Sequence, residues 1–404
     1  MSTQELAIPD IIIKSKKVVY LEGIRGVAAF MVVIHHFCLA FYPSLLNGVP
    51  DSSHLNKLEL LYYSSPFIFL TNGQLFVYIF FILSGFVLSK KFFKEKDINY
   101  LVSASVRRFP RLFIPVAFSL IIAFLFLKCS LNYNEQVSHI TKSIWFASLK
   151  GDPSFIHFLK VFFYKSIVVT DNSYITVLWS VSVELYGSFI VFSTLALTRN
   201  VKNLFFILTL LFVLFALERN AEYCAFIMGI MLNYSDTIKL KNTFFKALVI
   251  VILIITGCFL GGFPHIYYLS VPTIKGSFYS FLNYSALIDN SAFINACGAF
   301  LLILAVQLSA KLQDFFSSKA LAFLGNISFS MYLIHTIILR SVTSFTFLKI
   351  IGYCSYNISF IISFISSIVI IFVLSYFMTI YVDKNSLVAS KYVYNRFFLR
   401  KTGK

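Results

Sequence analysis

Hydrophobic residues in this chain occur in long continuous runs rather than in short alternating segments. Each run approaches the roughly 20 residues with which an α-helix crosses a bilayer, whereas a membrane β-barrel shows short segments of alternating hydrophobicity. The pattern predicts an all-α polytopic integral membrane protein with about ten transmembrane helices. The predicted spans are 25–45, 66–88, 112–128, 176–197, 204–217, 221–234, 247–263, 291–309, 322–345 and 358–382. The 204–234 segment has two interpretations, two short spans or one re-entrant hairpin.

The composition agrees with a membrane protein and excludes several other classes. Hydrophobic residues make up 58% of the 404 residues and charged residues only 13%, against about 45–50% and about 25% in soluble domains. Too few charges are present to cover a folded surface in water, which excludes a soluble enzyme, a disordered chain and a disulfide scaffold. The six cysteines are isolated from one another, so we expect buried thiols and no metal site.

The charged residues orient the predicted helices. Lys and Arg number 34 and Asp and Glu 17, a net charge of +17. In a soluble protein this excess would suggest nucleic acid, but in a membrane protein it indicates cytoplasmic loops beside anionic lipid, and we expect no nucleic-acid partner. With the N-terminus in the cytoplasm, most cations fall on that side. The predicted parts are a cytoplasmic tail over 1–20, a membrane domain over 21–383 and a basic cytoplasmic tail over 384–404.

The first span carries ionisable residues that need a reason to be there, because each costs about 2.5–3.5 kcal/mol at membrane depth. At about 100° per residue, Arg25 and His36 fall on one helix face, about 16 Å apart along the axis. His35 points about 80° away, and Gly26 allows another helix to approach closely. The alternative interpretation is an interfacial Arg anchor and a His bonded to a neighbouring helix.

Two further spans place polar side chains on one face. Glu184, on a face with Ser180, is a carboxylate inside the fourth span, just under the outer surface, and should have a cationic or hydroxyl partner. In the ninth span Ser328, Tyr332 and His335 share a face. Hydrogen bonding between helices is the alternative explanation for this second group.

Three arginines, Arg107, Arg108 and Arg111, lie close together beside two prolines, Pro110 and Pro115, which predicts a turn at the cytoplasmic interface. Two interpretations remain open for this predicted arginine turn. The arginines either anchor the protein by the positive-inside rule or bind a phosphorylated ligand, since guanidinium groups suit phosphate oxygens.

Five motifs, in this order along the chain, resemble those of the acyltransferase 3 family, the membrane O-acyltransferases that modify cell-surface glycans. The motifs are Arg-Gly-x-Ala-Ala…His (Arg25 to His36), Phe-Phe-x-Leu-Ser-Gly-Phe (Phe80 to Phe86), Arg-Arg-x-x-Arg-Leu before a Pro (Arg107 to Pro115), Leu-Trp-Ser-x-Ser-x-Glu (Leu178 to Glu184) and Ile-Ser-Phe-Ser-x-Tyr-Leu-x-His (Ile327 to His335).

The resemblance implies ten helices, a cytoplasmic acyl-CoA donor and a hydroxyl acceptor on the far side of the membrane. Acetyl-CoA is the expected donor. The expected acceptor is a polysaccharide or lipid-linked glycan such as O-antigen, capsule or exopolysaccharide, and the expected location is the bacterial inner membrane. Glu22 stands where the family more often has Asp, and His35 beside His36 leaves open which imidazole acts. The sequence ends at Lys404 without the hydrolase-like domain of some members, so we expect direct transfer.

The resemblance also implies roles for individual residues. His36 acts either as general base or as acyl-carrying nucleophile, Glu184 orients His36 or binds the acceptor, and no metal is needed. The candidate residues are His36, Glu184 and Arg25 for catalysis; Arg107, Arg108, Arg111 and Ser84 for coenzyme A; and Trp179, Tyr332, His335 and His35 for the substrate.

A transporter is the alternative from a different class. It would use Arg25, His36 and Glu184 as a proton or substrate relay, but it explains neither the arginine turn nor the absence of a visible inverted repeat. A non-catalytic membrane partner is a poorer third alternative. The sequence does not indicate an oligomeric state.

Overall fold

The computed structural model describes residues 16–238, 240, 242–264, 278–282 and 290–398, and this part of the chain is all-helical. Within it, eight helices are long and apolar enough to cross a membrane. The protein is therefore a polytopic integral membrane protein, and the predicted fold class is confirmed.

The eight long helices form the body of the molecule. They are α1 (Lys16–Phe41), α4 (Gly73–Glu95), α5 (Ile98–Lys128), α9 (Leu178–Leu197), α12 (Thr243–Gly261), α14 (Ser291–Leu308), α16 (Lys319–Ile338) continued by η7 (Leu339–Thr343) and α17 (Ser344–Ile350), and α18 (Tyr356–Met378) continued by η8 (Thr379–Asp383) and α19 (Lys384–Phe397).

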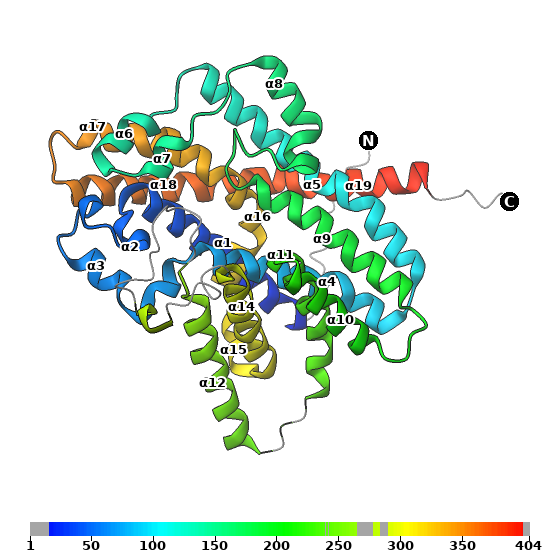
Figure 1. The fold of residues 1–404 in the computed structure, drawn as a ribbon. Helices are drawn as coiled ribbons and strands as arrows, with labels where there is room; N and C mark the ends of the chain where they lie inside the picture. The colour runs from blue at the N-terminus through cyan, green and yellow to red at the C-terminus, as the bar shows by residue number, and fades with distance from the viewer. Residues whose placement is uncertain (1–15, 239, 241, 265–277, 283–289, 399–404) are drawn as a thin grey trace, which may run out of the picture.

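Shorter helices connect or flank the long ones. They are α2 (Ser44–Asn47), η1 (Pro50–Ser52), α3 (Leu58–Tyr63), η2 (Pro66–Thr71), α6 (Asn134–Thr141), α7 (Ile144–Ser148), α8 (Phe155–Lys160), η3 (Val161–Val169), α10 (Leu204–Leu217), α11 (Ala221–Met231), η4 (Leu232–Thr237), η6 (Ser280–Leu282) and α15 (Ala310–Phe316). In Figure 1, α2, α3, α6 and α17 gather at one end of the bundle, and α19 runs to the opposite end.

Every predicted span falls on a helix of the described part. The two in doubt correspond to α10, with 14 residues, and α11, with 11 residues. Both are shorter than the roughly 17 residues of the shortest usual crossing, so both interpretations of the 204–234 segment stay open.

The predicted arginine turn is wrong, because α5 begins at Ile98, where the Asp97 side chain caps it by accepting the Asn99 N–H. Pro110 and Pro115 lie inside this helix. Membrane helices tolerate proline where neighbouring helices compensate for the lost backbone donor, and α5 packs along α9 and α19.

Several other predicted boundaries differ from the structure. The second span starts later than predicted, at Gly73, because η2 precedes it and Asn72 caps α4. The predicted C-terminal tail is helical over Lys384–Phe397, continuous with α18 (Figure 1). Most of the predicted N-terminal tail, the end of the C-terminal tail and most of the 264–290 loop lie outside the described residues.

Helices α1 and α16 pack most extensively against each other. At their crossing, a Cβ atom added at Gly26 would overlap the backbone of Gly325, and one added at Gly325 would overlap the backbone of Glu22. Small residues permit such backbone contact between membrane helices. The close approach predicted at Gly26 is therefore confirmed, and it brings the polar faces of the first and ninth spans together.

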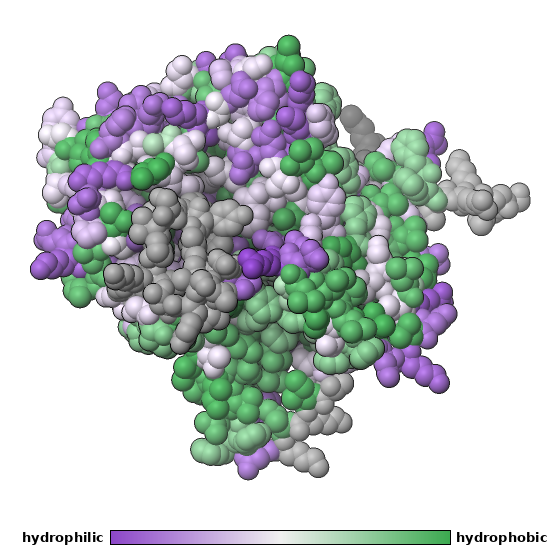
Figure 2. All heavy atoms as spheres, viewed as in Figure 1, coloured by the Kyte–Doolittle hydropathy of each residue, from purple (hydrophilic) through white to green (hydrophobic). Residues whose placement is uncertain are grey.

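The outer surface divides into an apolar and a polar region. Figure 2 shows hydrophobic side chains over α10 and α12 and hydrophilic side chains gathered over the α6 and α8 region. Phe206 of α10 is 61% exposed and Ile255 of α12 is 64% exposed. A soluble fold would bury such side chains, so we assign these faces to lipid.

We expect Gly26→Ala and Gly325→Ala to destabilise the bundle by about 1–3 kcal/mol, the usual penalty for overpacking. Thermal unfolding of the purified protein in detergent measures the effect. Gly352→Ala is the matched control, because a Cβ atom there meets nothing within 4 Å. Equal melting temperatures for all three variants would contradict the tight crossing.

Candidate active site

A cavity of about 340 Å³ lies in the half of the bundle predicted to face the cytoplasm. We call it the basic cavity, because three guanidinium groups line it, those of Arg25, Arg108 and Arg111, against two carboxylates, Glu22 and Glu184. The remaining lining is mainly apolar. This combination suits a ligand with an anionic group and a long, less polar arm.

Arg108 and Glu184 form an ion pair that joins α5 to α9. The Ser84 hydroxyl of α4 donates to Glu184 Oε1 at 2.5 Å and accepts from Arg108 Nη2 at 3.2 Å. Arg108 Nε donates to the Ser188 hydroxyl at 2.7 Å. Both charged side chains are mostly buried, 13% and 20% exposed, so three helices are fixed to one another by this network. The cationic or hydroxyl partner expected for Glu184 is thus present.

The other arginines differ in how well they are neutralised. Arg25 Nη1 lies 3.5 Å from Glu22 Oε2. Arg111 lines the cavity but forms no hydrogen bond or ion pair with any residue that the structure describes. Arg107 Nε instead donates to the Ser103 carbonyl at 3.0 Å, and the described lining of the cavity does not include Arg107. Arg111 is therefore the group best placed to bind an added anion.

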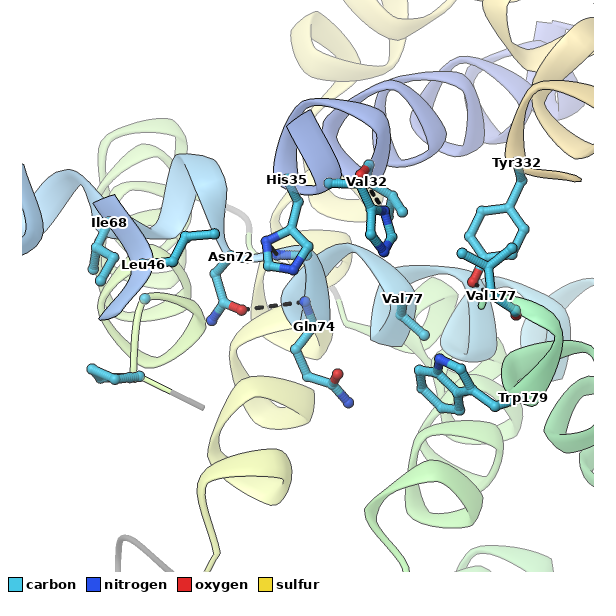
Figure 3. Close-up of a pocket in the computed structure, with 14 residues that line it drawn as sticks. Val32, His35, Leu46, Ile68, Asn72, Gln74, Val77, Val177, Trp179 and Tyr332 are labelled. Carbon is cyan, nitrogen blue, oxygen red and sulfur yellow. Dashed lines mark hydrogen bonds between the residues drawn. The ribbon is translucent and has the colours of Figure 1, made fainter. Parts of the chain in front are cut away.

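A second, smaller cavity of about 60 Å³ lies beyond the basic cavity. We call it the histidine cavity, because His35 and His36 line it together with Gln74 and Trp179. Figure 3 shows Trp179 and Tyr332 on one side of this space and His35 with Asn72 on the other. The Gln74 side-chain amide makes no hydrogen bond within the described part of the chain, so it is available to a ligand.

His36 is held by His335, and the hydrogen bonds fix which nitrogen carries the proton. His335 Nδ1 lies 3.1 Å from the Met331 carbonyl, which can only accept, so this nitrogen donates. In a neutral ring, Nε2 of His335 then accepts, and it lies 3.1 Å from His36 Nδ1. His36 Nδ1 is also 2.9 Å from the Val32 carbonyl, so it too donates. Within the described residues, His36 Nε2 accepts no hydrogen bond, so its lone pair is available to a ligand.

His35 is tied to the backbone where α4 begins. Its Nδ1 lies 2.6 Å from the Thr71 carbonyl and 3.1 Å from the Gly73 nitrogen. A Cβ atom added at Gly73 would lie 2.5 Å from the His35 ring, so glycine is needed for this approach. The arrangement favours His36 as the acting imidazole and His35 as its neighbour in the wall.

The two cavities are neighbours along the bundle and share part of their walls. Helices α1, α4, α9 and α16 each line both of them. On α1, Arg25 faces the basic cavity and Val32 the histidine cavity, and two residues, Val77 and Tyr332, line both. The predicted face shared by Arg25 and His36 therefore borders two neighbouring cavities. Glu184 belongs to the basic cavity and contacts Arg108, so the structure does not bring it to His36. The prediction that Glu184 lies just under the outer surface is therefore wrong, because its carboxylate pairs with an arginine in the half of the bundle predicted to face the cytoplasm.

Some residues at the site lay outside the sequence predictions. Trp145, on α7, places its ring centroid 5.2 Å from that of His36. The chain has only two tryptophans, and this rarity was a usable signal. Ser188 follows Glu184 by one helical turn, which spacing also indicated. Nothing in the sequence marked Gln74.

Within the described residues, no group of three or more His, Cys, Asp or Glu side chains is arranged to hold a metal ion.

Comparisons with known proteins identify the family. An O-acetyltransferase from Phomopsis amygdali, PaAT-1, is 31% identical over 130 residues, which cover 30% of this chain and 24% of that protein. The chain thus matches about a quarter of the length of this relative. No solved structure matches this chain significantly. The acyltransferase domain of a known family matches residues 18–380, nearly the whole described bundle. Because this match spans most of the chain, the protein belongs to the acyltransferase 3 family.

Proposed function

We propose that this acyltransferase moves an acetyl group from cytoplasmic acetyl-CoA, or another acyl group from its CoA thioester, to a hydroxyl of a glycan or lipid-linked glycan across the membrane. The observation that carries the proposal is the meeting of a cavity lined by arginines with a cavity lined by histidines. The relative's name supports O-acetyl transfer. The proposed glycan acceptor and the proposed location in a bacterial inner membrane both rest on the motif resemblance.

The basic cavity is the proposed donor site. Among the described residues no counter-ion is bonded to Arg111, so this guanidinium group suits a coenzyme A phosphate. The volume of the basic cavity, about 340 Å³, is within the range of small-molecule sites. Arg108 and Glu184 shape the wall, and the apolar lining receives the pantetheine arm, which then points the thioester toward the histidine cavity.

The histidine cavity is the proposed site of transfer. His36 Nε2 takes the proton of the acceptor hydroxyl while its oxygen attacks the thioester carbonyl. The carbon–sulfur bond then breaks, and the thiolate of coenzyme A recovers the proton from His36. Trp179 offers a sugar-stacking face and Gln74 an amide for acceptor hydroxyls. In the covalent alternative, the same Nε2 lone pair attacks the thioester first.

We expect His36→Ala to lower acetyl transfer by about 10²–10⁴-fold, the contribution of a general base. Purified protein in nanodiscs, labelled acetyl-CoA and the glycan acceptor provide the assay. Normal insertion with full transfer by this variant would exclude His36. Incubation without acceptor separates the two mechanisms, because only a nucleophilic His36 would place the label on the protein.

Arg111→Gln should raise the KM for acetyl-CoA about tenfold or more, because a hydrogen bond to a charged group contributes about 1.5–3 kcal/mol. Its kcat at saturating donor should change little. Arg199→Gln, a surface change outside both cavities, is the control. Equal KM values in both variants would show that the donor phosphates bind elsewhere.

His335→Leu should lower kcat by about a hundredfold with little change in the KM for acetyl-CoA, because a misoriented catalytic group loses about that much. His335→Gln keeps an acceptor oxygen for His36 Nδ1 and should retain more activity. If His335 has only a structural role, both variants should lose activity to a similar degree, in proportion to their loss of thermal stability. That result would argue against a positioning role for His335.

A further inference from the structure

We propose that Tyr332, latched by Ser180, is a gate between the two cavities that limits the size of the acyl group transferred. The inference rests on the proposed donor and acceptor sites, and it assigns Tyr332 a role in specificity rather than in sugar binding. Any acyl group that passes from the basic cavity to His36 must move past the residues shared by both walls, Val77 and Tyr332.

The Tyr332 hydroxyl is fixed in place by α9. It lies 2.7 Å from the Ser180 hydroxyl and 3.5 Å from the Val177 carbonyl. The Ser180 hydroxyl itself donates to the Val177 carbonyl at 2.9 Å, which leaves the Tyr332 hydroxyl as donor to Ser180. This hydrogen bond joins α16 to α9 across the junction, and both residues are buried, 7% and 6% exposed.

The Tyr332 ring is packed between the two sites. Its centroid lies 5.9 Å from that of Phe80, which lines the basic cavity, and 5.9 Å from that of His335, the partner of His36. Figure 3 shows Tyr332 and Val77 near Trp179 at one side of the histidine cavity. A rotation of Tyr332 away from Ser180 would remove part of the wall that the two cavities share.

The unequal cavity volumes give this gate a consequence for specificity. Coenzyme A enters through the basic cavity, so the acyl group is the leading end of the donor and reaches the junction first. About 340 Å³ lies behind the junction and about 60 Å³ ahead of it, where the acceptor hydroxyl must also fit. An acetyl group is the smallest acyl group with a carbon chain, whereas longer chains need the space that Tyr332 occupies.

The test compares acetyl-, butyryl- and hexanoyl-CoA as donors for the wild-type protein and for Tyr332→Ala, Tyr332→Phe and Ser180→Ala. We expect Tyr332→Ala to raise hexanoyl relative to acetyl transfer about tenfold or more, since each methylene that is accommodated contributes at least that discrimination. Tyr332→Phe and Ser180→Ala release the latch but keep the ring, so their ratios should rise by less.

Tyr186→Phe is the matched control, because it removes a hydroxyl from α9 that donates to the Val168 carbonyl outside both cavities. Its donor profile should equal that of the wild-type protein. An unchanged profile in an active Tyr332→Ala protein would overturn the gate alone. If Tyr332→Ala does not fold, unchanged profiles in both Tyr332→Phe and Ser180→Ala overturn it. A wild-type protein without CoA-dependent transfer would overturn the proposed function together with the gate.

Discussion

The ion pair between Arg108 and Glu184 organises the part of the bundle on which the rest of the site depends. Neither charge is stable alone at membrane depth, and removing one partner of a buried pair typically costs about 3–5 kcal/mol. The pair spans α5 and α9, and Ser84 adds α4. The pair neutralises two of the charges around the basic cavity, whereas Arg111 forms no ion pair with a described residue and can bind an anion.

The two cavities are lined by different kinds of ionisable side chain. Arginine and carboxylate side chains line the basic cavity. His36, in contrast, forms its hydrogen bonds with a second imidazole and a backbone carbonyl. A neutral imidazole whose Nε2 accepts no hydrogen bond from a described residue therefore lines the cavity next to the basic cavity. The separation of His36 from the guanidinium groups suits a general base, because a nearby cation would disfavour the imidazolium that forms when the ring takes up a proton.

The sequence predicted features of the site that depend on residues within one helix better than features that depend on contacts between helices. The shared face of Arg25 and His36 followed from helical periodicity within one span. The arginine turn was a wrong prediction, because proline is disfavoured in isolated helices but tolerated where membrane helices pack around it. The partner of Glu184 was predicted in kind, a cation or hydroxyl, but its identity depended on the arrangement of α4, α5 and α9.

The sequence by itself determined that this protein crosses the membrane many times and that very few ionisable groups lie inside it. Scarcity of charge made Arg25, His36 and Glu184 conspicuous, because an ionisable side chain at membrane depth carries an energetic cost that can be recognised from its type and position in the sequence. Only the tertiary structure decided that Glu184 bonds to Arg108, that His335 fixes the proton on His36, and that Tyr332 stands between two cavities. These contacts join residues far apart in the chain, and helical periodicity carries no information about which faces of different helices meet.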